Sequence, residues 1–398
     1  MSARDIAQDT DLARRLVALH RERYGREPDA ISFAPGRAEV LGNHTDYNLG
    51  TVLSTAVDVG HCFAISRNQG AGLRLLAGDL GETVSFSLDA VGPVMGAPWA
   101  SYVKGVFYNL ASGGLEVADW DCSFLGNVPI GSGLSSSAAL EVSAAFAAME
   151  IAGRALDLKD VAALCRDAES RFAGCNCGLL DQFSSIFGKA RSLIHTDFRS
   201  LEVTDVPLAA DVRFLIVTPE AAHRLADSPY NERRESCELA ARAFAALLPG
   251  RVESLRDVSP ADFERYRGRL PVEAAMRAAH IVGEIDRVAR GVAALRSGDI
   301  DAFGALMYES HESSRALFEN SSAELDLAVG AARDSGAPGA RLSGGGWGGS
   351  LIVLARQADI DRLGREIVER CAGRGLSVGA RQVVPSDGAR VLRGRAHA

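Results

Sequence analysis

A loop of small residues that runs directly into an apolar helix is the feature that most limits how this chain can fold. Residues 126–139 read GNVPIGSGLSSSAA, and residues 140–152 read LEVSAAFAAMEIA, which is apolar on nearly every side and free of proline and glycine. The second pattern predicts a buried helix. The first N–H groups of a helix have no partner within it and point outward with the positive end of the dipole, and small residues let an anion approach them. The loop, with three consecutive serine hydroxyls at 135–137, therefore predicts a cradle for the phosphates of a nucleotide.

Other phosphate-binding loops do not match this segment. A P-loop needs a lysine after its glycines, and none follows here. A dinucleotide-binding turn needs a third glycine where this chain has Ser136, and the HRD and DFG landmarks of protein kinases are absent. For the loop taken alone, a serine-rich cap on an ordinary helix is the open alternative.

Strands and helices are mixed in both halves of the chain. The patterns predict strands at 31–34, 52–59, 61–66, 73–76, 83–88, 192–195, 212–217 and 351–355. They predict helices at 11–24, 161–172, 179–187, 230–248, 274–297 and 301–320. Because the two types do not alternate strictly, we expect an α+β protein. A chain of 398 residues is too long for one ordinary core, so we expect two domains, residues 1–205 and 206–398.

Charge and cysteine content limit the partners and the compartment. A net charge of −8 argues against a general nucleic-acid binder and against a polybasic membrane anchor. No apolar run approaches the ~20 residues that cross a bilayer, and acids in the first eleven residues argue against a secretory signal. Of the seven cysteines only Cys175 and Cys177 form a close pair, and no second pair completes a zinc site. We therefore expect reduced thiols and a cytoplasmic location.

Three motifs in this order resemble those of the galactokinases, which belong to the GHMP superfamily of small-molecule kinases. PGRAEVLGNHTDYN at 35–48 resembles the galactokinase signature, usually written PGRVNLIGEHTDYN. The loop at 126–139 resembles the second motif of the superfamily, and RLSGGGWGGS at 341–350 resembles the third. Shorter matches lie at 99–106, 177–183, 230–234 and 306–313. The resemblance implies a two-domain GHMP-kinase architecture, with the active site in the cleft between the domains.

The activity that the resemblance implies is ATP-dependent phosphorylation of D-galactose at its C1 hydroxyl, which gives galactose 1-phosphate. By the same resemblance, Asp181 is the catalytic carboxylate, and Arg37 keeps it ionised and stabilises charge on the transferring phosphoryl group. Ser137 and Glu169 match the family's Mg²⁺ ligands, and both supply the oxygen donors that a hard cation requires. Mg²⁺ would accompany ATP as the co-substrate.

The resemblance also assigns the binding residues. The ATP phosphates would contact Gly131, Ser132, Gly133, Leu134, Ser135, Ser136 and Ser137. The sugar would contact Asn43, His44, Asp46 and Tyr230. An aspartate that accepts two hydroxyl hydrogen bonds discriminates strongly between sugars, whereas His44 could instead be a buried residue with partners inside the protein. We expect a sugar and ATP as partners, no nucleic acid or membrane, and a monomer or weak homodimer.

Position 43 departs from the family pattern. The family usually has a glutamate there, which bonds the C6 hydroxyl of galactose, and Asn43 is neutral. An asparagine offers both a donor and an acceptor, so it could hold a hydroxymethyl group or accept a carboxylate that glutamate would repel. The pair Ala38 and Glu39 replaces the common Val-Asn, while Trp347 and Ser350 replace Phe and Cys.

Two alternatives follow from these departures. The nearest is a kinase of the same fold that acts on a uronic acid, an N-acetylhexosamine or arabinose. The other is a catalytically silent sugar sensor. The intact SSAA at 136–139, together with Arg37, Glu169 and Asp181, argues against the sensor.

Overall fold

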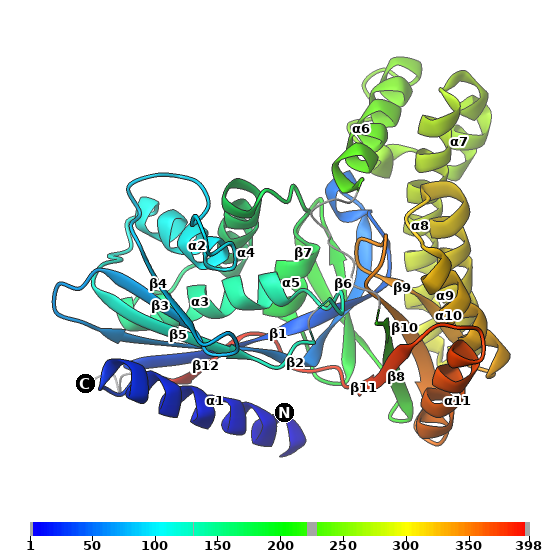
Figure 1. The fold of residues 1–398 in the computed structure, drawn as a ribbon. Helices are drawn as coiled ribbons and strands as arrows, with labels where there is room; N and C mark the ends of the chain where they lie inside the picture. The colour runs from blue at the N-terminus through cyan, green and yellow to red at the C-terminus, as the bar shows by residue number, and fades with distance from the viewer. Residues whose placement is uncertain (1–2, 130, 221–228, 395–398) are drawn as a thin grey trace.

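The computed structural model describes residues 3–129, 131–220 and 229–394, and in these ranges the chain forms two sheets flanked by helices (Figure 1). The larger sheet has the order β12-β1-β2-β5-β3-β4, and β6 joins β2 and carries β7. Its pairs are antiparallel except β3 with β5. Its strands are β1 (Ala30–Leu41), β2 (Thr51–Arg67), β3 (Leu73–Ala77), β4 (Glu82–Phe86), β5 (Trp120–Gly126), β6 (Ser192–Asp197), β7 (Glu202–Pro207) and β12 (Arg390–Arg393).

The smaller sheet is antiparallel throughout, with the order β11-β8-β10-β9. Its strands are β8 (Val212–Pro219), β9 (Gly339–Ser343), β10 (Ser350–Arg356) and β11 (Val378–Val383). The chain thus passes from the first sheet to the second after β7, and it returns to the first sheet with β12.

Helices cover both sheets. In Figure 1, α1 lies against one face of the larger sheet and α2 to α5 against the other, while α9 to α11 lie beside the smaller sheet and α6 and α7 pack against α8, away from that sheet. Their bounds are α1 (Ala3–Tyr24), α2 (Ala100–Ser112), α3 (Ser136–Ala152), α4 (Leu158–Ala168), α5 (Leu180–Phe187), α6 (Tyr230–Leu247), α7 (Pro260–Tyr266), α8 (Val272–Ser297), α9 (Ile300–Ser313), α10 (Ala323–Asp334) and α11 (Ile360–Ala372). No helix in the described ranges combines the length and apolar character needed to span a membrane.

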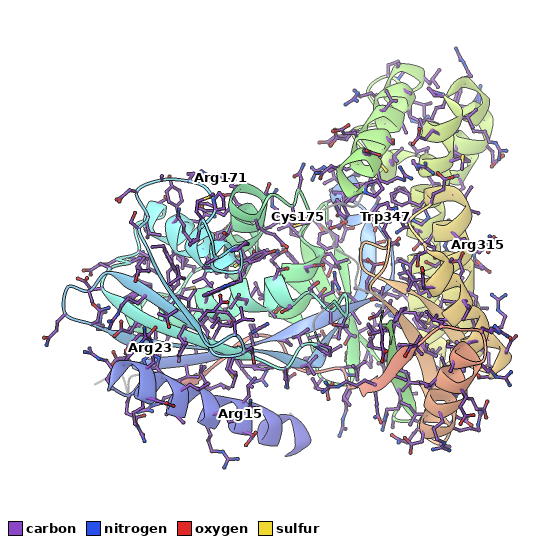
Figure 2. All side chains as sticks on the ribbon, in the orientation of Figure 1. Arg15, Arg23, Arg171, Cys175, Arg315 and Trp347 are labelled. Atoms are coloured by element: carbon purple, nitrogen blue, oxygen red, sulfur yellow. The ribbon has the colours of Figure 1, made fainter. Side chains whose placement is uncertain are left out.

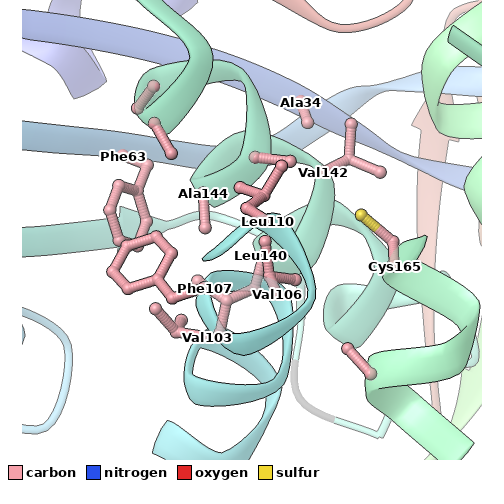
Figure 3. Packing of buried hydrophobic residues seen from close by; sticks show 14 of the residues in the cluster. Ala34, Phe63, Val103, Val106, Phe107, Leu110, Leu140, Val142, Ala144 and Cys165 are labelled. Carbon is pink, nitrogen blue, oxygen red and sulfur yellow. The ribbon is translucent and has the colours of Figure 1, made fainter. Parts of the chain in front are cut away.

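The buried helix predicted at 140–152 is confirmed as α3, which begins earlier, at Ser136. It lies in the main core between the larger sheet and helices α2, α4 and α5, as the close-up in Figure 3 shows for Leu140, Val142 and Ala144. Neighbours on most sides explain its largely apolar sequence.

The short strand predicted before Pro35 does not end there, and that part of the prediction is wrong. β1 runs through Pro35 and Gly36, with a shift of its pairing to β2 between Pro35 and Arg37. In this bulge the N–H of Arg37 donates to the carbonyl oxygen of Leu134 at 3.0 Å. A Cβ on Gly36 would lie 2.5 Å from that oxygen, so only glycine permits the approach. The bulge therefore brings the glycine-serine loop against β1.

Other predicted boundaries also move. The strands predicted at 52–59 and 61–66 form one strand, β2, because Gly60 fits where a Cβ would lie 2.2 Å from the carbonyl oxygen of Ala34. The helix predicted at 161–172 ends at Ala168 and continues as a π-helical turn, Glu169–Ala173. The helix predicted at 301–320 likewise gives way to a π-helical turn, Ser314–Phe318.

Candidate active site

One cavity of about 290 Å³ collects all the predicted catalytic, sugar-binding, ATP-binding and metal-ligand residues. It opens where the C-terminal end of β1, the N-termini of α3 and α5, the start of α6 and the loop between β9 and β10 meet. Figure 2 shows Cys175 on the side of the helices that cover the larger sheet and Trp347 on the side of α6 and α8. The predicted residues on its wall are Arg37, Asn43, His44, Asp46, Gly131, Ser132, Gly133, Leu134, Ser135, Ser136, Ser137, Glu169, Asp181 and Tyr230.

Asp181, in the first turn of α5, is held by two partners. Nε of Arg37 donates to its Oδ1 at 2.7 Å, and the hydroxyl of Ser135 donates to its Oδ2. Arg37 also donates from Nη1 to the carbonyl oxygen of Gly133 at 2.6 Å. The carboxylate is thus fixed in position at the edge of the glycine-serine loop.

Ser135 occupies the N-cap position of α3, but it does not cap the helix. Its backbone is left-handed, with φ of 54°, and its side chain makes no capping hydrogen bond. The first backbone bond within the helix runs from the N–H of Ala139 to the carbonyl of Ser135, so the N–H groups at the start of α3 have no helical partner. This end of α3 has the form of an anion site, and the alternative of an ordinary serine cap does not describe it.

The glycine-rich segment between β9 and β10 packs against this loop. Ser350 donates from Oγ to the carbonyl oxygen of Ser132 at 2.5 Å, which gives the serine at this divergent position a structural role. Gly346 has φ of 89°, and a Cβ there would lie 2.1 Å from the carbonyl oxygen of Asn320. The third motif therefore forms part of the wall of the cavity, with its Gly344 beside the guanidinium of Arg37.

Glu169 faces the loop from the π-helical turn. Ser137 donates from Oγ to its Oε1 at 3.0 Å, and Gln182 donates to its Oε2 at 3.0 Å. Burial, together with the neighbouring Asp181 carboxylate, raises the pKa of Glu169, and Glu141 lies across Gln182 with its pKa also raised by burial and by Glu169. A hydroxyl and a carboxylate beside a phosphate loop, within an excess of negative charge, suit a divalent hard cation.

Asp46 begins a short 3₁₀ turn, Asp46–Asn48, beside α5. Burial, with the Asp181 and Glu39 carboxylates nearby, raises its pKa to about 6. A Cβ on Gly178 would overlap its carboxylate, at 1.7 Å from Oδ2, so Asp46 fits only because position 178 is glycine. Tyr230, the first residue of α6, faces Gly345 and lies 5.1 Å from the ring of His44.

Both ring nitrogens of His44 have partners inside the protein. Nε2 lies 2.9 Å from the carbonyl oxygen of Gly345, and Nδ1 lies 3.0 Å from the hydroxyl of Tyr47. Burial lowers the pKa of His44 to about 4, so the ring is neutral near pH 7. These contacts favour the alternative of a buried residue that shapes the pocket.

Asn43 has no hydrogen-bonding capacity left for a sugar. Its side-chain amide donates to Oε1 of Glu39 at 3.0 Å and to the carbonyl oxygen of Gly344 at 2.8 Å. Its Oδ1 accepts from Asn320 at 2.9 Å and from Ser314 at 3.3 Å, and the residue is 0% exposed. The expected direct contact between the Asn43 side chain and a sugar hydroxyl therefore needs correction, because all of its donors and acceptors are used within the protein.

Glu39 is one of the cavity residues that the sequence did not assign to the site. It lies two residues beyond Arg37 on β1, so the two side chains lie on the same face of the strand. This spacing in the sequence could have assigned Glu39 to the site. Its Oε1 accepts from Nη1 of Arg341, a fully buried residue of β9, at 2.7 Å. Burial raises the pKa of Glu39, while the positive charge of Arg341 acts to lower it.

Helix α8 holds the sugar motif in place. Oε2 of Glu284 accepts from the backbone N–H groups of Gly42 and Asn43 at 3.0 and 2.9 Å. Burial raises the pKa of Glu284, but Arg287 and His280 lower it by more. The pKa therefore lies well below the ordinary range of a glutamate. The positions of the sugar residues thus depend on contacts between segments far apart in the chain.

Family models match three parts of the chain. The galactokinase galactose-binding signature matches residues 18–67. The N-terminal and C-terminal domains of GHMP kinases match residues 101–189 and 292–373.

Similar proteins extend over most of the chain. The galactokinase of Streptomyces coelicolor is 39% identical over 379 residues, which is 94% of this chain and 96% of that protein. The galactokinase of Roseiflexus sp. is 36% identical, over 87% of this chain and 89% of its own. Among solved structures, the Lactococcus lactis galactokinase complexed with galactose matches with a TM-score of 0.88 and 27% identity, over 94% of this chain and 98% of that one. The Methanococcus jannaschii mevalonate kinase, at 16% identity and a TM-score of 0.63 over 91% of this chain and 100% of its own, shares the fold.

Proposed function

This chain belongs to the galactokinase family of the GHMP kinases, and from that premise we propose that it transfers the γ-phosphoryl group of ATP to the C1 hydroxyl of D-galactose. The observation that carries the proposal is the position of Asp181. Its carboxylate is bonded at once to Arg37 and to Ser135 of the glycine-serine loop, inside the cavity that the sugar motif also lines. An acceptor hydroxyl and a terminal phosphate therefore meet beside one carboxylate.

In the proposed reaction, the C1 hydroxyl donates a hydrogen bond to Asp181, which fixes its oxygen in line with the γ-phosphorus. The bond from this oxygen to phosphorus forms, the bond to the β-phosphate oxygen breaks, and the hydroxyl proton passes to Asp181. ADP and galactose 1-phosphate leave. Arg37 stabilises the charge on the transferring group, and N–H groups at the start of α3 hold the phosphates. Phosphoryl transfer depends largely on such positioning and charge stabilisation.

Mg²⁺ would be held by Ser137 and Glu169, and when bound it would neutralise charge on the ATP phosphates. The donors present fit this ion, because a hydroxyl and a buried carboxylate with a raised pKa meet beside the loop. Asp46 and Tyr230 line the sugar end of the cavity, where Asp46 would accept bonds from sugar hydroxyls and Tyr230 would close the pocket. ATP is the co-substrate.

We also propose a division into two domains, with the predicted boundary at 205/206 moved past the end of β7 (Glu202–Pro207), because the chain changes sheet only between β7 and β8; β12 then returns to pair with β1. A cytoplasmic location is supported by the free thiols of all seven cysteines. We propose a monomer or weak homodimer.

A panel of monosaccharides tests the function. We expect ADP release with galactose, measured in a coupled assay, and much less with galacturonic acid, N-acetylgalactosamine or arabinose. Turnover of another sugar with none of galactose would reassign the substrate, and no turnover of any sugar, despite sugar binding, would favour a sensor.

A further inference from the structure

The wall of the cavity near Asn43 contains one oxygen that no protein group uses. Three polar side chains meet there, namely Asn43, Glu39 and Arg341. The amide of Asn43 is saturated by protein partners. Arg341 uses only Nη1, and its Nε and Nη2 are sealed from solvent without a partner. Neither side chain can therefore meet a bound molecule.

Glu39 differs from both. Its Oε1 takes the bonds from Asn43 and Arg341, and its Oε2 has no hydrogen-bond partner within the described residues. The residue is only 2% exposed, yet it lines the cavity. Oε2 is also not among the buried atoms that are sealed without a partner. A buried carboxylate oxygen that faces a cavity needs a donor from a ligand or from water.

The geometry of β1 indicates which part of a ligand this oxygen meets. Arg37 and Glu39 are separated by one pleat of the strand, about 6.8 Å, and their pairing with β2 is regular between them. Arg37 is bonded to Asp181, where the reacting hydroxyl would lie. A hexopyranose with C1 at Asp181 would therefore extend its opposite end toward Glu39.

We propose that Glu39 is the specificity-determining acid of this pocket, and that its Oε2 accepts a hydrogen bond from a sugar hydroxyl remote from C1, at C4 or C6. This inference rests on the proposed function. A carboxylate at this place accepts bonds from hydroxyl donors and repels a carboxylate on the sugar, so Glu39 selects neutral hexoses and disfavours uronic acids. Asn43 then acts as a positioning residue, because its amide and Arg341 orient Oε1.

The test compares the wild type with Glu39→Gln. For each, kcat/KM is measured with galactose, 4-deoxygalactose, 6-deoxygalactose and galacturonic acid. We expect the wild type to lose about 10- to 100-fold on one deoxy sugar, which is the range for a hydrogen bond to a charged group. In Glu39→Gln that penalty should shrink by about tenfold, and galacturonic acid should improve relative to galactose. Glu309→Gln, on the exposed face of α9, is the matched control and should keep the wild-type pattern.

The outcomes separate the two proposals. If the wild type does not phosphorylate galactose, the proposed function fails. If it does, but Glu39→Gln leaves both deoxy penalties and the galacturonate ratio unchanged, the role of Glu39 is overturned. Should the variant not fold, a crystal structure of the wild type with galactose decides the question: a sugar hydroxyl within hydrogen-bond distance of Oε2 supports the proposal, and only water there overturns it.

A second inference rests on the thiols of the same cavity. The sulfur atoms of Cys175 and Cys177 and a carboxylate oxygen of Glu169 all lie within 4.8 Å of one another, and Sγ of Cys177 lies 3.3 Å from Oε2 of Glu169. Cys175 is exposed, and all three residues line the cavity, so an ion can reach them. Two thiolates and a carboxylate are ligands that zinc prefers, with water in the fourth position.

We infer that this cluster binds a thiophilic divalent cation such as Zn²⁺, with release of the thiol protons to solvent, and that binding inhibits the kinase by occupying Glu169. Zinc is titrated into the metal-free protein against a chromophoric chelator. We expect one zinc ion per chain, and an affinity at least about tenfold lower in Cys175→Ser. Zinc at concentrations that inhibit the wild type should inhibit that variant less, relative to its own turnover without zinc, and Cys371→Ala in α11 should bind zinc like the wild type. Absence of stoichiometric binding, or equal affinity in Cys175→Ser, would overturn the inference.

Discussion

Ser135 donates its hydroxyl hydrogen bond to Oδ2 of Asp181, so the proposed catalytic carboxylate is tied directly to the loop that would hold the nucleotide. Arg37 holds the other carboxylate oxygen and also reaches the carbonyl oxygen of Gly133 in that loop. Because these groups come from β1, from the start of α3 and from α5, the packing of three elements determines one reaction geometry.

Replacing Asp181 with alanine should lower kcat by about 10²- to 10⁴-fold, the usual contribution of a positioned acid or base. Nucleotide binding should be largely kept, because the carboxylate acts on the acceptor hydroxyl. Steady-state kinetics and calorimetric titration with a non-hydrolysable ATP analogue measure the two effects. Asp181→Asn controls for volume, and near-normal turnover in either variant would contradict the assignment.

Ser135→Ala should reduce kcat less, by roughly 10- to 100-fold, because one charge-assisted hydrogen bond is lost while Arg37 still holds Asp181. The KM for galactose should change little, since Ser135 positions the carboxylate and does not contact the remote hydroxyls. Ser297→Ala is the control, because this exposed serine lies outside the cavity and its hydroxyl bonds only to a carbonyl oxygen of its own helix, α8. A Ser135→Ala variant whose loss appeared only in the KM for galactose would argue for a different role.

The exchange of residue types between positions 39 and 43 makes a prediction about stability. Asn43→Glu alone would place a second carboxylate beside Glu39 in a buried site, which should destabilise the fold by about 3–5 kcal/mol. The double variant Glu39→Asn/Asn43→Glu restores one acid and one amide, with Arg341 still neutralised, so it should recover at least about 1–3 kcal/mol of that loss. Chemical denaturation of the wild type, both single variants and the double variant gives the coupling energy. Additive effects would show that the two positions are independent.

The sequence predicted those features that depend on residues close together in the chain. An apolar run without breakers predicted α3, and the glycines and serines before it predicted an open helix N-terminus, which the structure shows. The passage of β1 through Pro35 and Gly36 was not predictable in the same way, because it depends on the carbonyl oxygen of Leu134, about a hundred residues away in the chain.

The sugar pocket is a second feature that depends on residues far apart in the chain. Position 43 was recognised as unusual from the motif, but its role depends on Ser314 and Asn320, which lie in another part of the chain and saturate its amide. The place of Glu39 depends likewise on Arg341 of β9. Motifs identify which residues gather at a site. Which of them bond to each other, and which stay free for a ligand, is determined by the three-dimensional structure.

Asp46 should link pH to both stability and sugar binding. Its folded-state pKa of about 6 lies above the ordinary 3.8, so folding takes up a proton between these values, and the charged form opposes folding at neutral pH. This penalty is complete above pH 6 and disappears as the pH falls below 3.8. Asp46→Asn should therefore raise stability at pH 7.5, by at most about 3 kcal/mol, and the gain should vanish near pH 4. Thermal unfolding of both proteins across this range measures it, while the affinity for galactose should fall in the variant.

Glu169→Gln should weaken the use of Mg²⁺ and stabilise the metal-free protein. The carboxylate is buried and bonded to Ser137, the neighbouring Asp181 disfavours its charged form, and it in turn disfavours the charged form of Glu141. Removing one charge relieves this repulsion, so the unfolding temperature without Mg²⁺ should rise, while the Mg²⁺ concentration for half-maximal activity should increase by at least about 10-fold. Glu309→Gln should change neither quantity. A variant with the wild-type Mg²⁺ requirement would show that Glu169 does not hold the ion, whatever its stability.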